Sequence, residues 1–142
     1  MKVIRITEEK DFNEAYRIRK NVFVEEQGVP AENEFDAYET HAQHILVYYD
    51  NKPVATGRIR IIDNVAKLER ICVLASYRKY GLGKVAVDEL EIIAKEKGIT
   101  KAKLHAQTQA KGFYERLGYI VNSEQFMEEG MPHFSMIKDL CV

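Results

Sequence analysis

The part of the sequence with the clearest chemical potential is a turn with two glycines over residues 78–84, which reads Arg-Lys-Tyr-Gly-Leu-Gly-Lys. Gly81 and Gly83 allow the backbone to come close to a ligand and to point its N–H groups outward. The apolar spacing beyond the turn predicts a helix over residues 82–97. Because the first N–H groups of a helix are unpaired and lie at the positive end of its dipole, this turn can hold a pyrophosphate. The basic side chains that add local positive charge are Arg78, Lys79 and Lys84.

Two common nucleotide-binding motifs fit this turn poorly. A P-loop requires glycine where Arg78 stands and serine or threonine where Val85 stands. A dinucleotide fingerprint has glycine or alanine in its last position, occupied here by Ala86, but it follows the first strand of a repeating α/β unit. The pattern RxxGxG fits without exception. The competing interpretation is an ordinary strand-to-helix turn with solvated basic side chains.

The elements that must position this turn predict a mixed α/β sheet. Three strand-like runs, residues 44–49, 53–62 and 65–74, are separated by Asp- and Asn-rich turns and predict an antiparallel meander. A strand over residues 101–107 would complete a β-α-β crossover with the run that precedes the turn. The other predicted elements are an edge strand over 2–7, helices over 8–26 and 110–117, a solvated acidic loop over 31–43, and strands over 119–127 and 133–138.

Composition limits the class of protein. A chain of 142 residues with 46% hydrophobic residues predicts one domain, residues 1–142, with its own core. The formal net charge of -1 gives no general attraction to nucleic acid or to an anionic membrane, so any anion site must be local. The first ten residues become charged too early for a signal peptide, and no apolar run approaches the roughly 20 residues of a membrane helix. We therefore expect a cytoplasmic protein.

Cysteine and histidine usage indicates neither a disulfide framework nor a metal site. Cys72 and Cys141 form no CxxC pair, which suits a reducing compartment. The spacing of His41 and His44 relative to the nearby acidic residues matches no standard metal site, so we expect no metal.

Three segments in order resemble the GCN5-related N-acetyltransferase (GNAT) superfamily. They are Leu68-Glu69-Arg70-Ile71-Cys72-Val73, the RxxGxG turn, and Phe113-Tyr114-Glu115-Arg116-Leu117-Gly118-Tyr119. The resemblance covers nearly the whole chain. The segments Val22–Gln27 and Glu129–His133, with His44, are similar to a small bacterial branch of the superfamily, the ElaA/YjcF-like proteins.

The resemblance implies a single-domain GNAT-like fold, whose mixed, mostly antiparallel sheet has splayed central strands. It implies acetyl-coenzyme A as co-substrate, with pantetheine in the gap between the strands at residues 68–74 and 101–107. The backbone of Ile71, Cys72 and Val73 would pair with pantetheine like an added strand. The residues expected at the pyrophosphate are Arg78, Lys79, Tyr80, Gly81, Leu82, Gly83 and Lys84.

Amine acetylation requires a neutral amine, stabilisation of an oxyanion and a proton for the departing thiolate. Tyr114 matches the general acid of the family, and the competing interpretation is aromatic packing on a short helix. Glu69 is the first candidate for the general base, although a paired or solvated carboxylate explains it as well. His44 and His133 are alternative bases, because imidazole titrates near neutral pH. The residues expected to bind the acceptor are Glu26, His44 and His133.

Cys72 could form an acetyl-cysteine intermediate, but Arg70 is the one cation near it in sequence, so a buried thiol and direct transfer are favoured. The predicted function is N-acetylation of a primary amine, of a small molecule in preference to a protein. A catalytically inactive acyl-coenzyme A sensor is the alternative. The acidic run Glu32–Glu39 favours a cationic acceptor, and the sequence leaves open whether the chain forms a homodimer.

Overall fold

A computed structural model of the chain describes residues 1–34, 36 and 39–140, so Cys141, considered above, lies outside the described residues. Within that part, eight strands form one sheet in the order β1-β2-β3-β4-β5-β8-β6, and β7 pairs with β8. β4 and β5 are parallel and the other described pairs are antiparallel, which confirms the predicted mixed sheet. The strands are β1 (Lys2–Arg5), β2 (Gln43–Tyr49), β3 (Lys52–Ile62), β4 (Val65–Val73), β5 (Lys101–Gln107), β6 (Ile120–Val121), β7 (Phe126–Glu128) and β8 (Met131–Asp139).

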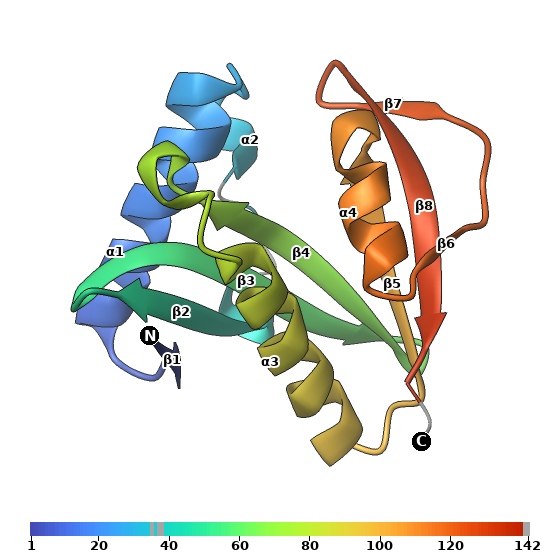
Figure 1. Cartoon of the computed structure of the whole chain (residues 1–142), viewed down its shortest axis with the longest axis horizontal. Coiled ribbons are helices and arrows are strands. Elements are labelled where there is room, and N and C mark those ends of the chain that lie inside the picture. Colours follow the sequence, from blue (N-terminus) through green and yellow to red (C-terminus); the bar gives the residue numbers. More distant parts are fainter. Residues whose placement is uncertain (35, 37–38, 141–142) are drawn as a thin grey trace.

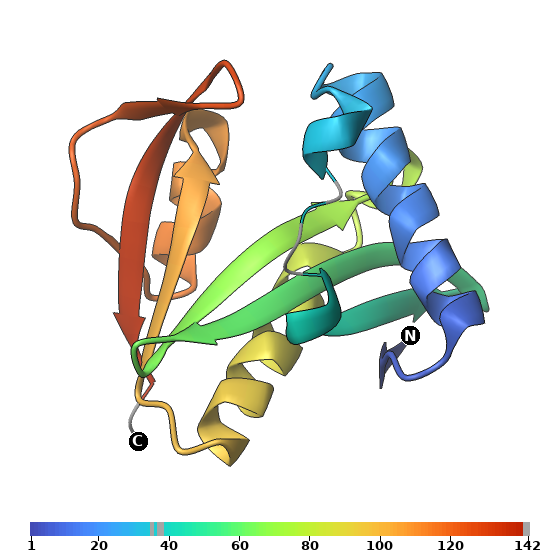
Figure 2. The same cartoon turned by 180° about the vertical axis from the view of Figure 1, so that it is seen from behind.

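Helices cover both faces of the sheet. α1 (Glu9–Arg19) lies on one face of β2–β4 and α3 (Leu82–Glu96) on the other, while α4 (Lys111–Arg116) lies beside β5 and β8 (Figures 1 and 2). α1 continues as a π-helical segment, Lys20–Glu26. The shorter helices are α2 (Ala31–Glu34) and the 3-10 turns Glu39–His41, Ala75–Tyr77 and Thr108–Ala110. No helix in the described residues is long and apolar enough to cross a membrane.

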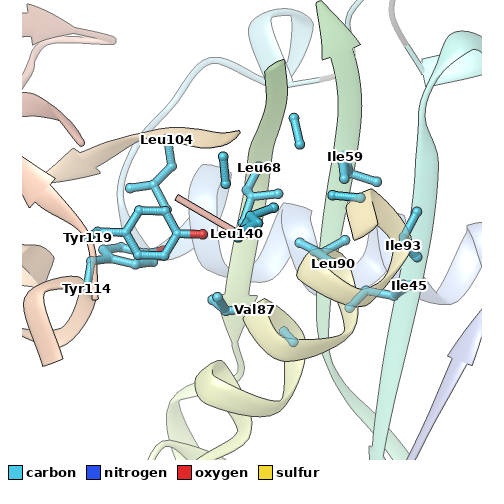
Figure 3. Packing of buried hydrophobic residues seen from close by; sticks show 14 of the residues in the cluster. Ile45, Ile59, Leu68, Val87, Leu90, Ile93, Leu104, Tyr114, Tyr119 and Leu140 are labelled. Atoms are coloured by element: carbon cyan, nitrogen blue, oxygen red, sulfur yellow. The ribbon is translucent and has the colours of Figure 1, made fainter. Parts of the chain in front are cut away.

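The larger apolar cluster fills the space between α3, α4 and the sheet. Leu90 and Ile93 of α3 pack there beside Ile45 of β2, and Tyr114 and Tyr119 close its other side (Figure 3). The Tyr119 hydroxyl donates to Glu91 Oε2 at 2.9 Å, so its polar end is satisfied inside the protein. A smaller cluster under α1 contains Ala15, Ile18, Val22, Leu46 and Cys72.

A bulge in β4 changes the direction of its side chains. Thr56 opposes Cys72 and Arg58 opposes Glu69, so Arg70 and Ile71 share one partner position opposite Gly57. Arg70 has a φ of 56°, the left-handed conformation typical of a bulge. Without the extra residue, Cys72 would share the face of Leu68. With it, Cys72 joins the cluster under α1, while Ile71 packs against the cluster under α3.

β4 leaves its parallel neighbour soon after their pairing begins. Ala66–Leu68 pair with Ala102–Leu104, and beyond Leu68 the two strands diverge into a V (Figure 1). The splayed central strands predicted above are therefore present.

The helix predicted over residues 8–26 is present as α1 followed directly by the π-helical segment, in which Gln27 N donates to Val22 O at 3.1 Å. Two other predictions about local structure were wrong. The acidic stretch is not a solvated loop, since Glu34 is only 2% exposed and pairs with buried arginine. The strand expected over 119–127 is two short strands, β6 and β7.

Candidate active site

A larger and a smaller cavity adjoin the point where β4 leaves β5. The larger, about 650 Å³, is lined by the π-helical segment, α2, β3, β4, β5 and the β7–β8 hairpin. The smaller, about 290 Å³, lies between the glycine-containing turn and α4. The residues that line both cavities are Ile71, Cys72, Val73, Arg78, Ala110 and Tyr114. A molecule in the smaller cavity would therefore share these walls with a molecule in the larger one.

The two positions of the turn that carry glycine require it for different structural reasons. Gly81 precedes α3 with a φ of 71°, a conformation that glycine adopts without steric cost. A Cβ on Gly83 would lie 3.1 Å from the Phe113 ring, so a glycine here lets α3 and α4 approach each other. Both glycines line the smaller cavity at the positive end of the 15-residue helix α3.

Arg78 is held by the protein itself. Its Nε donates to the Val73 carbonyl at 3.0 Å, and its two terminal nitrogens donate to the Glu26 carboxylate at 2.7 and 2.6 Å. Glu26 is not among the described residues that line either cavity. The predicted acceptor-binding residue Glu26 is thus in contact with the glycine-containing turn, and it fixes the direction of Arg78.

The remaining side chains of the turn lie at the surface. Lys84 pairs with Asp88 at 2.8 Å, and Lys79 is exposed. Tyr80 is 47% exposed and stacks on Tyr49 with ring centroids 4.4 Å apart.

Tyr114 lies at the junction of the two cavities. Its side chain is 9% exposed, and burial raises the pKa of its phenol, as does the nearby Cys72 to a smaller extent. Within the described residues its hydroxyl makes no hydrogen bond, although Tyr119 nearby is bound to Glu91. Tyr114 is therefore a protonated phenol whose donor is free to meet a ligand.

Cys72 is a poor nucleophile in this environment. Burial raises the pKa of its thiol, and the Glu34 carboxylate raises it further. Its side chain packs against Ile18 and Val22 under α1. Because the thiolate is the reactive form, Cys72 is an unreactive thiol at neutral pH.

Glu69 carries a carboxylate that cations surround. It accepts hydrogen bonds from Arg58 at 2.8 Å and from Arg60 at 2.7 and 2.9 Å, and Lys67 Nζ lies 3.3 Å away. Burial alone would raise the pKa of Glu69, but these contacts outweigh it and lower the pKa to about 2. A carboxylate with this pKa is a weak base at neutral pH.

Glu69 belongs to a buried ionic network that the sequence did not reveal. Arg58, only 1% exposed, also pairs with Asp36 and Glu39, and fully buried Arg19 pairs with Glu34 and Glu39. Both arginines have other arginines two residues away, Arg17 and Arg60, so nothing in the local sequence marks them as buried. The network joins α1, α2, β3 and β4 into the N-terminal wall of the larger cavity.

The structure does not bring His44 to either cavity. The side chain of His44 lies under α1 with its edge against the Phe12 ring, 5.1 Å between centroids, and its Nε2 is 3.0 Å from the Glu39 carbonyl. Burial lowers the pKa of His44, which keeps the imidazole neutral. The predicted acceptor-binding residue His44 is therefore part of the support for the 39–41 segment.

His133 does line the larger cavity, and it has two neighbours that the sequence did not single out. His105 Nδ1 lies 3.0 Å from Glu128 Oε1, and His133 Nε2 lies 3.8 Å from Glu128 Oε2. All three side chains line the cavity on its C-terminal wall, formed by β5, β7 and β8. The alternation in β5, where His105 follows buried Leu104, is the one signal in the sequence that could have pointed to this group.

Two side-chain bridges cross the open side of the V between these walls. Gln107 Nε2 donates to Gln27 Oε1 at 2.8 Å, and Asn33 Nδ2 donates to Glu129 Oε2 at 3.2 Å. Figure 2 shows α2 and the β7–β8 hairpin on the two sides of this opening. The bridges partly cover the larger cavity.

Comparison with known proteins agrees with this geometry. The family model described as "Acetyltransferase (GNAT) domain" matches residues 10–140. YyaT of Bacillus subtilis is 57% identical over 99% of this chain and 97% of its own length. YjcF of the same organism, named as an N-acetyltransferase, is 46% identical over 98% of this chain and all of its own length.

Solved structures show the same fold. A Lactobacillus plantarum protein superimposes with a TM-score of 0.91 at 32% identity, covering 99% of this chain and 98% of its own. Escherichia coli ElaA superimposes with a TM-score of 0.82 at 21% identity, over 96% and 98% of the two chains. The PaiA N-acetyltransferase of Thermoplasma acidophilum, solved with coenzyme A, has a TM-score of 0.74 at 20% identity over 98% and 99%.

The splayed mixed sheet, with the glycine-containing turn at the start of α3, is the fold of a GNAT-type acyltransferase. The chain belongs to the GNAT acetyltransferase family, as the resemblance in the sequence predicted.

Proposed function

We propose that this protein transfers an acetyl group from acetyl-coenzyme A directly to a primary amine of a small molecule. The observation that carries the proposal is that Tyr114, a buried phenol with no internal partner in the described chain, lines both cavities. A thioester in the smaller cavity and an amine in the larger one would meet beside its hydroxyl.

In this proposal coenzyme A occupies the smaller cavity and the gap beside β4. The pyrophosphate lies on the N–H groups of the turn that ends at Lys84, where the dipole of α3 favours an anion. Pantetheine pairs with the backbone of Ile71–Val73, which has no strand partner on the β5 side beyond Leu68 among the described pairs. The proposal is consistent with PaiA, a protein of the same fold that was solved with coenzyme A.

The chemistry follows from the groups at the junction. The neutral amine attacks the thioester carbonyl carbon, a C–N bond forms and the C–S bond breaks. Tyr114 gives its proton to the leaving sulfur, and the amine nitrogen gives one proton to a base. Because the pKa of Tyr114 is raised, the phenol is protonated when the reaction begins. The sulfur becomes basic as the C–S bond breaks, and it accepts the proton at that stage.

The size of the larger cavity supports a small molecule as the acceptor. Its volume of about 650 Å³ falls within the usual range for small-molecule sites. The bridges from Gln27 and Asn33 also narrow the opening through which a protein segment would have to enter.

The test is an acetyl-coenzyme A turnover assay across a panel of primary amines, with Tyr114→Phe as the first variant. This change keeps the ring and its packing but removes the donor, so turnover should fall about 10²–10⁴-fold. Affinity for coenzyme A and the melting temperature should change little. Tyr48→Phe removes a hydroxyl outside both cavities and should leave turnover unchanged.

The proposal fails if wild type turns over no amine while binding acetyl-coenzyme A, which would indicate a sensor. If Tyr114→Phe lowers the melting temperature and leaves turnover intact, Tyr114 is structural and another group protonates the thiolate.

A further inference from the structure

The C-terminal wall of the acceptor cavity carries a group of titratable side chains that the scheme above does not use. A two-residue turn at Glu129 and Gly130, both with positive φ, joins β7 to β8 and fixes their register. In that register Phe126 opposes His133, so Glu128 lies diagonal to His133 on the same face. The Phe126 ring separates the two imidazoles, 5.0 Å from His105 and 6.0 Å from His133.

The hydrogen bonds of this group define its tautomers. His133 Nδ1 lies 2.8 Å from the Met131 carbonyl, which can only accept, so this nitrogen carries the hydrogen. Nε2 of neutral His133 is therefore an unprotonated nitrogen. His105 Nδ1 likewise donates to Glu128 at 3.0 Å. A proton taken up by His133 Nε2 would face the Glu128 carboxylate, 3.8 Å away, which would stabilise the imidazolium.

We propose that His133 is the general base that removes the proton from the acceptor amine, and that Glu128 and His105 are its positioning residues. The inference rests on the proposed acetyl transfer and assigns the base that this reaction needs. In the balanced reaction the amine nitrogen loses one proton to His133 Nε2 as the C–N bond forms. Tyr114 gives one proton to sulfur, and the imidazolium returns a proton to the tyrosinate through solvent.

The carboxylates of the N-terminal wall are less suited than His133 to accept the proton of the amine. The Glu69 carboxylate has a pKa of about 2 because of its arginine partners, and Asp36 pairs with Arg58. Glu34, also in the cavity wall, is 3.0 Å from Arg70 and 2.7 Å from Arg19. Each of these carboxylates would lose an arginine contact on protonation, whereas His133 gains a carboxylate contact.

The charged neighbours of His133 come from three strands. Glu128 of β7 is the closest, His105 of β5 shares that carboxylate, and Lys67 of β4 acts on Glu128 from the opposite wall. The hydrogen bond from His105 is the largest cause of the lowered pKa of Glu128, which favours a carboxylate anion beside His133. Gln107, which opposes His133 on β5, is uncharged.

The experiment is a pH profile of kcat/KM for one accepted amine, corrected for the fraction of free amine at each pH. Wild type should lose activity toward acid as His133 becomes protonated. His133→Gln should lower kcat about 10²–10³-fold and remove this acidic limb, with unchanged affinity for coenzyme A. Glu128→Gln should shift the limb to lower pH, because the imidazolium loses its counter-charge. His41→Gln, the same change at an exposed histidine outside the cavity, should leave the profile unaltered.

A titration of the His133 imidazole by NMR provides a readout without turnover: its pKa should be lower in Glu128→Gln than in wild type. If wild type is active and His133→Gln keeps both its rate and its acidic limb, the base is another group while the proposed transfer stands. An equal imidazole pKa in the two proteins overturns the role of Glu128. If no amine is acetylated by wild type, the assignment of a base fails together with the proposed function.

Discussion

The two walls of the acceptor cavity differ in how their charges are held. On the N-terminal wall, Arg58 is 1% exposed and binds Asp36, Glu39 and Glu69. The positive and negative charges of this wall therefore neutralise one another inside the protein. On the C-terminal wall the charged group is a glutamate between two imidazoles, His105 and His133. The arginines of the first wall stay charged across the neutral range, because arginine does not lose its proton there, whereas the second wall carries imidazole nitrogens that can accept a proton.

This difference indicates a division of roles. The N-terminal wall ties α1, α2, β3 and β4 together through buried ion pairs. In the proposed reaction, the C-terminal wall accepts a proton from the acceptor amine. The sequence pointed to Glu69 of β4 as the first candidate for the general base, but Glu69 lies on the wall that is less suited to accept a proton.

The largest effect on binding affinity is expected at neither wall but in the glycine-containing turn. Gly81→Asp should weaken coenzyme A binding by at least roughly 100-fold, since a carboxylate about 4 Å from a phosphate costs about 4 kcal/mol at an effective dielectric constant of 20. Isothermal titration calorimetry measures this change. Gly81→Asn has nearly the same size, tolerates the φ of 71° equally well and adds no charge, so it should bind far better than the aspartate variant. Equal affinities for the two variants would mean that the pyrophosphate lies elsewhere.

The next effect concerns the stability of the N-terminal wall. The folded pKa of Glu69 is about 2 against an ordinary value of 4.5, a difference that corresponds to about 3 kcal/mol of stability at neutral pH. Because the folded pKa is lowered, this contribution is complete above pH 4.5 and is lost as the pH falls toward 2. Glu69→Gln should therefore destabilise the protein by about this amount at pH 7, and less at pH 3.

Urea unfolding at the two pH values measures that difference, with Glu32→Gln as an exposed control that should change the free energy of unfolding by less than about 0.5 kcal/mol. A destabilisation by Glu69→Gln that is equal at pH 7 and pH 3 would contradict the assigned pKa. The comparison of the walls also predicts that Glu69→Gln leaves the acidic limb of the rate profile in place.

The smallest effect is expected for the thiol between the walls. Because burial keeps Cys72 protonated, Cys72→Ala should retain turnover within about threefold of wild type. Mass spectrometry of wild type with acetyl-coenzyme A and no acceptor should detect no acetyl group on Cys72. An adduct that forms and decays as fast as turnover would require a covalent intermediate instead.

Much of the fold could be predicted from local pattern. The helix expected over residues 82–97 is α3, Leu82–Glu96, and the strand expected over 101–107 is β5. Both could be predicted because regular apolar spacing, and the glycine that ends the helix, are local features of the sequence. The turn at Gly81 and Gly83, with the motif around Tyr114, was enough to identify the family. The sequence did not show that β6 (Ile120–Val121) and β7 (Phe126–Glu128) are separate strands, because strands of two or three residues are too short for a clear alternation of polar and apolar residues.

The sequence by itself thus predicted most of the elements, the glycine-containing turn before α3 and the family motif around Tyr114, all of which depend on residues close together in the chain. The tertiary structure alone decided what the carboxylates and imidazoles can do. Glu69 became a weak base only because β3 brings Arg58 and Arg60 beside it, and Cys72 turned under α1 only because of a bulge at Arg70. A pKa depends on burial and on charges from distant segments, and neither can be deduced from the neighbours of a residue along the chain.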